Sequence, residues 1–121
     1  MTITWTMATR LSNPLNHSRC WQDRKNIARN QRTAARFIAA EALQKAKFNF
    51  LAIPKLRITM TRTGPREMDR DGNVASLKHV QDGISDCLGM NDNDKRLDWQ
   101  YCQRTGAGVK YGVEIILEER R

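Results

Sequence analysis

The sequence predicts a single α/β domain of the α+β kind, in which one mixed sheet has helices packed on it. Stretches that alternate apolar and polar residues, typical of half-buried strands, are separated by two stretches with helical periodicity. The chain has 121 residues, which fits one domain spanning residues 1–121. The expected element order is β-α-β-α-β-β.

The first half of the chain predicts a strand followed by a long helix. Residues 2–7 alternate threonine with apolar side chains, which is the two-residue period of a half-buried strand. Residues 11–16 (LSNPLN) interrupt this pattern, because Asn-Pro favours a turn. The helix is expected over about residues 22–45, which are rich in the good helix formers Ala, Arg and Gln. Its apolar side is expected to consist of Ile27, Ala34 and Ile38, with Phe37 near it.

The second half predicts a strand, a second helix and two further strands. Residues 56–61 alternate again, and the second helix is expected over about residues 73–88, with Gly89 as its C-terminal cap. Its apolar residues follow a period of 3.6 and are Val74, Leu77, Val80, Ile84 and Leu88. Strands are expected at residues 97–101 and 111–117, and the glycine turn at 106–108 predicts that they form a hairpin.

Charge is distributed unevenly along the chain. The net charge is +8; residues 1–55 carry ten basic and two acidic side chains, whereas residues 56–121 carry eleven of each. This asymmetry favours a polyanion as partner of the first half, although it could also serve only solubility. Basic residues of the first helix are spaced by 4, 3 and 4 and therefore share one face, which is either a nucleic-acid surface or a solvated face. They are Lys25, Arg29, Arg32 and Arg36.

Aspartates flank the second helix: Asp69 and Asp71 precede it, and Asp92 and Asp94 follow it. Carboxylate oxygens suit a hard cation such as Mg²⁺, which can activate water beside a phosphodiester. A helix of this length measures roughly 20 Å, so the two groups meet only if the second loop folds back or two protomers share a site. The alternative is that they cap the helix and shape a turn.

Lys78 lies on the second helix, four residues before Asp82. It is either half of a helix salt bridge or a cation that stabilises charge on a phosphate or a leaving oxygen. Four aromatic side chains could stack on nucleobases, but they are expected to pack in the core or at a dimer contact instead. They are Trp5, Trp21, Trp99 and Tyr101.

Residues 68–92 (MDRDGNVASLKHVQDGISDCLGMND) resemble the core of the RusA-type Holliday junction resolvases, a family of phage- and prophage-borne bacterial enzymes. The shared pattern is an Asp-rich strand end, a helix with a Lys and an Asp-Gly-Ile step, then Leu-Gly and an acidic pair. Residues 95–101 (KRLDWQY) resemble the family's step into an aromatic strand, and residues 11–16 its Pro-rich turn. The resemblance therefore covers nearly the whole chain, with the specific part at residues 68–92.

The resemblance implies a homodimer that resolves four-way DNA junctions by paired nicking in recombination and repair, with Mg²⁺ or Mn²⁺ as cofactor. It implies that Asp69, Asp71 and Asp92 are catalytic, metal-binding carboxylates and that Lys78 is the family's essential lysine. Two positions depart from the pattern. Gly72 stands where the family prefers Asn, and Asn91 replaces the first member of the acidic pair, which leaves open an inactive prophage relative.

Two hypotheses from other classes stay open beside the endonuclease. A non-catalytic DNA-binding protein of phage origin explains the basic helix but leaves the aspartates as caps, and metal-dependent cleavage separates the two. An RNA-binding module is the third hypothesis.

The expected compartment is a reducing cytoplasm, that of a bacterium or of a phage-infected cell. The three cysteines (Cys20, Cys87 and Cys102) show no disulfide or zinc spacing. No apolar stretch is long enough for a membrane span, and residues 1–7 do not read as a signal peptide.

Overall fold

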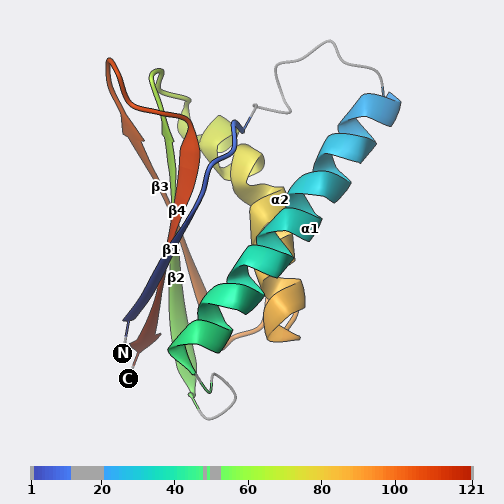
Figure 1. Cartoon of the computed structure of the whole chain (residues 1–121), viewed down its shortest axis with the longest axis vertical. Helices are drawn as coiled ribbons and strands as arrows, with labels where there is room; N and C mark the ends of the chain where they lie inside the picture. Colours follow the sequence, from blue (N-terminus) through green and yellow to red (C-terminus); the bar gives the residue numbers. More distant parts are fainter. Residues whose placement is uncertain (1, 12–20, 48, 50–52, 121) are drawn as a thin grey trace.

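The computed structural model describes residues 2–11, 21–47, 49 and 53–120. The elements, in chain order, are β1 (Thr2–Met7), α1 (Trp21–Ala46), β2 (Lys55–Gly64), α2 (Arg70–Leu88), β3 (Leu97–Thr105) and β4 (Gly112–Arg120). The four strands form one mixed sheet, and both helices lie on the same face of it (Figure 1). The predicted fold class and element order are confirmed, whereas most of the Asn-Pro turn predicted at 11–16 lies outside the described residues.

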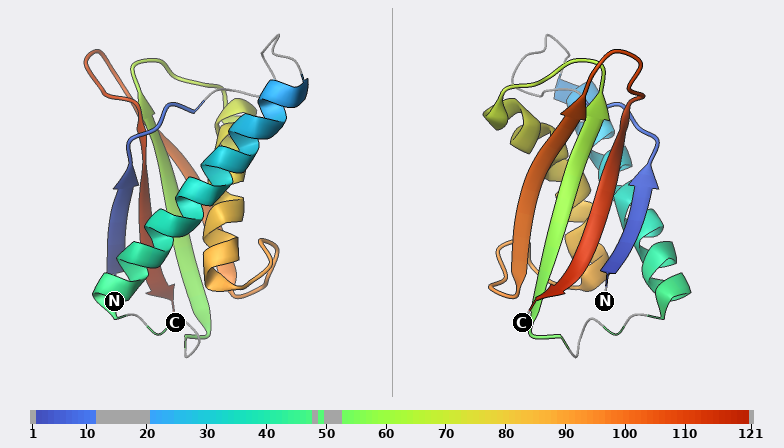
Figure 2. Two further views of the ribbon diagram at one scale, coloured as in Figure 1. Left: turned by 45° about the vertical axis from the view of Figure 1, so that its right-hand side comes forward. Right: turned by 90° about the vertical axis from the view of Figure 1, so that its left-hand side faces the viewer.

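The predicted hairpin between the last two strands is wrong. The sheet order is β1-β4-β2-β3, so β4 lies between β1 and β2 and β3 forms an edge. β3 runs parallel to β2, whereas β4 runs antiparallel to β2 and to β1. The connection at residues 106–111 therefore passes the end of β2 (Figure 2). β4 suits an inner position because Val113, Ile115 and Leu117 are buried, while β3 alternates its helix-facing residues with exposed ones, as an edge strand tolerates.

The buried face of α1 consists of two alanines and a leucine and differs from the predicted one. Ala35, Ala39 and Leu43 are buried, whereas Ala34 and Phe37 are exposed and Ile27 and Ile38 are only half-buried. The reason is the close crossing of the two helices, where α2 has a glycine. A Cβ added to Gly83 would lie 2.6 Å from the Cβ of Ala35, so only an alanine-lined face of α1 can approach α2 here.

α2 begins and ends at residues that stabilise helix termini. The Asp69 carboxylate accepts a hydrogen bond from the Gly72 amide at 2.8 Å, which is an N-cap. Gly89 is the C-cap, as predicted, and adopts a left-handed φ of 67°. Four of the five predicted apolar positions of α2 are buried and the fifth, Val74, is half-buried. Packing between α1 and the sheet leaves the Lys78 side of α2 at the surface.

Two further expectations concern the described residues only. None of their helices is long and apolar enough to cross a membrane. Cys87 and Cys102 are free thiols, as the lack of disulfide spacing predicted, and Cys20 lies outside the described residues.

Candidate functional site

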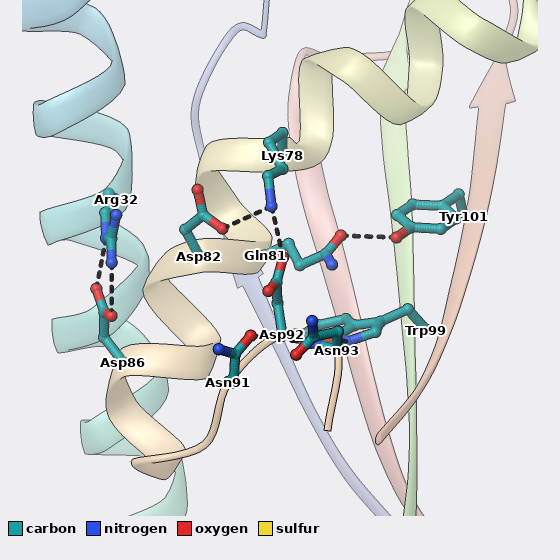
Figure 3. Close-up of polar contacts among 10 residues, drawn as sticks. All are labelled: Arg32, Lys78, Gln81, Asp82, Asp86, Asn91, Asp92, Asn93, Trp99 and Tyr101. Atoms are coloured by element: carbon teal, nitrogen blue, oxygen red, sulfur yellow. Dashed lines mark hydrogen bonds and ion pairs between the residues drawn. The ribbon is translucent and has the colours of Figure 1, made fainter. Parts of the chain in front are cut away.

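Lys78 and Asp92, which were both candidates in the sequence, are in direct contact. The Lys78 ammonium lies 2.5 Å from a carboxylate oxygen of Asp92 and 3.0 Å from one of Asp82 (Figure 3). Asp82 is one helical turn beyond Lys78, whereas Asp92 comes from the loop after α2. The result is one cation held between two carboxylates at the surface, with half of the Lys78 side chain exposed.

The loop after α2 folds back toward the middle of the helix, and β3 holds it there. The indole nitrogen of Trp99 donates a hydrogen bond to the backbone carbonyl of Asp92 at 2.7 Å. Within the loop, the Asn91 side chain accepts from the Asn93 amide, and Asp94 accepts from the backbone and side chain of Arg96. Asn91 thus shapes a turn, which is the structural use of the position where the family pattern has an acid.

A second ion pair lies beside the first and joins the two helices. Arg32 of α1 contacts the Asp86 carboxylate of α2 through two hydrogen bonds of 2.6 and 2.8 Å (Figure 3). A surface cavity of about 280 Å³ lies next to both pairs, and Arg32, Asp82, Asp86 and Asp92 are among its lining residues. Three carboxylates and a guanidinium therefore share one open, polar depression.

Hydrogen bonding within these pairs stabilises the charged forms of Lys78, Asp86 and Asp92. Hydrogen bonding to Asp92 raises the pKa of Lys78, and the same contact lowers the pKa of Asp92. Hydrogen bonding to Arg32 likewise lowers the pKa of Asp86. Lys78 is consequently a full cation, and Asp86 and Asp92 are full anions, near neutral pH.

Asp69 and Asp71 lie at the other end of α2 from Asp92. Lys78 is eight residues into the helix, which places it about 12 Å along the axis from the first turn. Asp71, Lys78 and Asp82 are spaced by seven and four residues and share one side of α2. The predicted carboxylates Asp69, Asp71 and Asp92 therefore lie at two separate places along α2 and do not converge on one ion within a single chain.

The fit to a metal ion follows from this arrangement. Among the described residues, no group of three or more His, Cys, Asp or Glu side chains is arranged to hold one metal. The three-carboxylate set Asp69, Asp71 and Asp92 therefore does not fit a single ion in one chain. Mg²⁺ often binds through only one or two protein carboxylates and completes its shell with water and phosphate oxygens. Asp82 and Asp92 each contact Lys78 through one oxygen, which leaves the other oxygen of each carboxylate for such an ion.

The basic residues of α1 are exposed, as predicted, but they are not equivalent. Arg32 pairs with Asp86 across the helix interface, whereas Arg29 and Arg36 are exposed on the same side of α1. The Arg32 side chain still has 52% of its surface exposed. The row therefore passes the acidic depression at Arg32 and extends along α1 in both directions from it.

Sequence reasoning missed two features of this region. Asp82 was considered only as a helix salt-bridge partner of Lys78. The second carboxylate in contact with Lys78 belongs to Asp92, which lies fourteen residues further along the chain. Trp99 and Tyr101 pack against the core, as expected, but they are only half-buried and lie beside α2, where the Tyr101 hydroxyl donates to Gln81 at 2.7 Å. Their spacing of two on a strand put them on one face, which was the available signal.

Comparison with protein-family models gives no match, and comparison with curated proteins gives none either.

Proposed function

We propose that this protein is a Mg²⁺-dependent endonuclease that cuts branched DNA such as four-way junctions, with Lys78, Asp82 and Asp92 at the centre of its site. The observation that carries the proposal is the contact between Lys78 and Asp92. Both were singled out by their resemblance to the resolvase pattern, and they lie side by side although fourteen residues separate them.

Lys78 supplies the charge that phosphodiester cleavage needs. Cleavage develops negative charge on the phosphate and on the leaving oxygen, and a positioned cation stabilises it. Asp82 and Asp92 orient the ammonium, and because its pKa is raised, Lys78 is protonated near neutral pH. Half of its side chain is exposed, so it is accessible to a phosphate.

The carboxylates supply the place for a metal ion. Asp82 and Asp92 would hold Mg²⁺, or Mn²⁺ in its place, with a phosphate oxygen of the DNA completing the shell. A bound ion would neutralise charge at the scissile phosphate and would offset the repulsion between DNA and these two carboxylates.

The basic row of α1 is the proposed DNA-binding surface. Lys25, Arg29, Arg32 and Arg36 would contact the phosphate backbone, which gives affinity without sequence preference. Arg32 lines the same depression as Asp82 and Asp92. A strand bound along α1 would therefore run into the proposed cleavage site.

We further propose a homodimer, because it offers Asp69 and Asp71 a role in cleavage. Within one chain these residues are about two helical turns or more away from Lys78. A second copy could bring its own Asp69 and Asp71 to the Asp82–Asp92 pair, and the shared site would then contain all the carboxylates of the family pattern.

The test is cleavage of an end-labelled four-way junction with Mg²⁺ or with a chelator, beside linear duplex of the same sequence. We expect paired nicks in the junction only, and only with Mg²⁺. Asp92→Asn should lower the rate by about 100-fold while junction binding in chelator is kept. Tight junction binding without cutting in Mg²⁺ or Mn²⁺ would contradict the proposal and identify a non-catalytic DNA-binding protein.

A further inference from the structure

A second cavity lies between the N-terminal half of α2 and the edge strand β3, on the same side of α2 as Lys78. Its volume is about 320 Å³, which is at the small end of the range for ligand pockets. Its lining residues are Arg70, Asn73, Val74, Trp99, Gln100 and Tyr101. None of these six is acidic, in contrast to the neighbouring depression with its three carboxylates.

The aromatic wall of this cavity is held in place from both ends. Trp99 and Tyr101 are two residues apart on β3 and point to the same face. The Trp99 indole donates to the Asp92 carbonyl and the Tyr101 hydroxyl donates to Gln81, each at 2.7 Å (Figure 3). Because their polar atoms are already bonded to the protein, the ring surfaces are positioned in advance for stacking.

We propose that this cavity binds one unpaired nucleobase, stacked on Trp99 and Tyr101. The inference rests on the proposed function for its choice of ligand, since every base has a flat aromatic surface that can stack on an aromatic side chain. Arg70, Val74 and Lys78 are spaced by four residues and form one row on α2. A base in the cavity would thus have Arg70 on one side and Lys78, about 6 Å from Val74 along the axis, on the other.

Branched DNA has unpaired or easily unpaired bases at the branch point. A base held here would place its own backbone beside Lys78 and Asp92, because the Trp99 indole is bonded to Asp92 itself. The cavity would therefore select single-stranded or opened DNA and align it with the site.

Filling the cavity tests the inference. Val74 is half-buried and lines the cavity, so Val74→Trp should occupy the space that a base would take. The measurement is the fluorescence anisotropy of a labelled single-stranded oligothymidylate in chelator at fixed salt, with a linear duplex in parallel. We expect Val74→Trp to weaken single-strand binding about tenfold and to leave duplex binding unchanged. Tyr111→Leu, which removes an exposed aromatic ring outside the cavity, is the matched control and should bind like the wild type.

Thermal unfolding shows whether Val74→Trp folds. If it does not, a second pair of variants provides the test. Trp99→Leu should lose single-strand affinity to a similar extent, whereas Trp99→Phe, which keeps a ring but not the bond to Asp92, should retain most of it. Wild-type single-strand binding in a folded Val74→Trp protein, or in Trp99→Leu, overturns the inference. These binding assays contain no metal, so they are independent of the cleavage assay. If the cavity variants lose single-strand binding but the wild type cuts no junction, only the proposed nuclease activity is contradicted. If the wild type cuts junctions but the cavity variants bind single strands normally, only the nucleobase site is contradicted.

Discussion

At the start of α2, the Asp69 carboxylate accepts a hydrogen bond from the backbone amide of Gly72, and beyond its end the Asp92 carboxylate contacts the ammonium of Lys78. Both aspartates occupied matching places in the sequence pattern, one on each side of a helix. Capping accounts fully for the position of Asp69. Local structure does not account for Asp92, because its partner is fourteen residues away and a Trp99 hydrogen bond holds its backbone. A carboxylate held by a distant cation is thus the stronger indication of a site than one that caps its own helix.

The largest effect on cleavage is expected from removing the Lys78 cation, which contacts Asp92 and not Asp69. Lys78→Met should lower the rate of junction cleavage about 100- to 1000-fold, because the charge that stabilises the transition state is lost. Junction affinity in chelator should change little. Lys45→Met is the matched control, since Lys45 is also a helix lysine with an acidic partner, Glu41, at 3.0 Å. Equal cleavage by the Lys78 and Lys45 variants would remove Lys78 from the site.

A mixing experiment asks whether the two ends of α2 act together across two chains. Asp71→Asn and Asp92→Asn should each lower the rate of cleavage about 100-fold while keeping, or strengthening, junction binding, because a negative charge facing DNA is removed. If a dimer shares its sites, refolding the two variants together creates hybrids with one intact site. We therefore expect the mixture to regain cleavage. A mixture as inactive as its components, with hybrids verified by native mass spectrometry, would show that the two ends do not form a common site.

At the start of α2, the free energy of unfolding should depend on the capping hydrogen bond of Asp69 and not on the negative charge of its side chain. Asp69→Ala should lower the free energy of unfolding by about 1 kcal/mol, because the Gly72 amide loses its acceptor. Asp69→Ser should restore most of that loss, since serine caps helices well. Chemical denaturation near neutral pH measures both. If Asp69→Ser is stable but no longer cuts junctions, the carboxylate has a role in cleavage beyond the cap.

The smallest expected effect concerns the ion pair between the helices and its dependence on pH. Asp86 has a pKa below its usual 3.8 because Arg32 is bonded to it. The pair therefore contributes stability above that usual value, and the contribution is lost as the pH falls through the lowered pKa of Asp86. Arg32→Gln should cost at most about 1 kcal/mol near neutral pH, because the pair is half-exposed, and almost nothing in strong acid. An equal cost at both pH values would mean that Arg32 acts through packing.

The parts of the fold that depend on local pattern were predictable, and those that depend on strand order were not. Both helices and all four strands follow from periodicity, and the Gly89 cap follows from a single residue. The hairpin failed because the glycine turn at 106–108 predicts a change of direction but not the strand beside which the chain returns. The prediction of the buried face of α1 failed because the helix crossing at Gly83 favours alanine over larger apolar residues.

The candidate site divides in the same way. Lys78 and the aspartates Asp69, Asp71 and Asp92 were singled out by residue type and by the resemblance to the resolvase pattern, because the proposed cleavage of phosphodiesters would need these groups. Their contacts required the path of the loop after α2, which the Trp99 hydrogen bond fixes. The pairing of Arg32 with Asp86 was equally out of reach, because 54 residues separate the partners.

The inner position of β4 has a consequence for how the molecule assembles. Within the described residues β1 pairs with β4 alone, and Thr2 is opposite Glu118. During synthesis, the apolar side of β1 therefore has no strand to join until residues 113–118 have left the ribosome, whereas β2, α2 and β3 can dock on each other earlier as a parallel unit. Such long-range pairing slows folding and leaves an unpaired strand exposed to aggregation in the meantime. We therefore expect the three-element unit that carries Lys78 and Asp92 to form first and the strand that completes the sheet to join last.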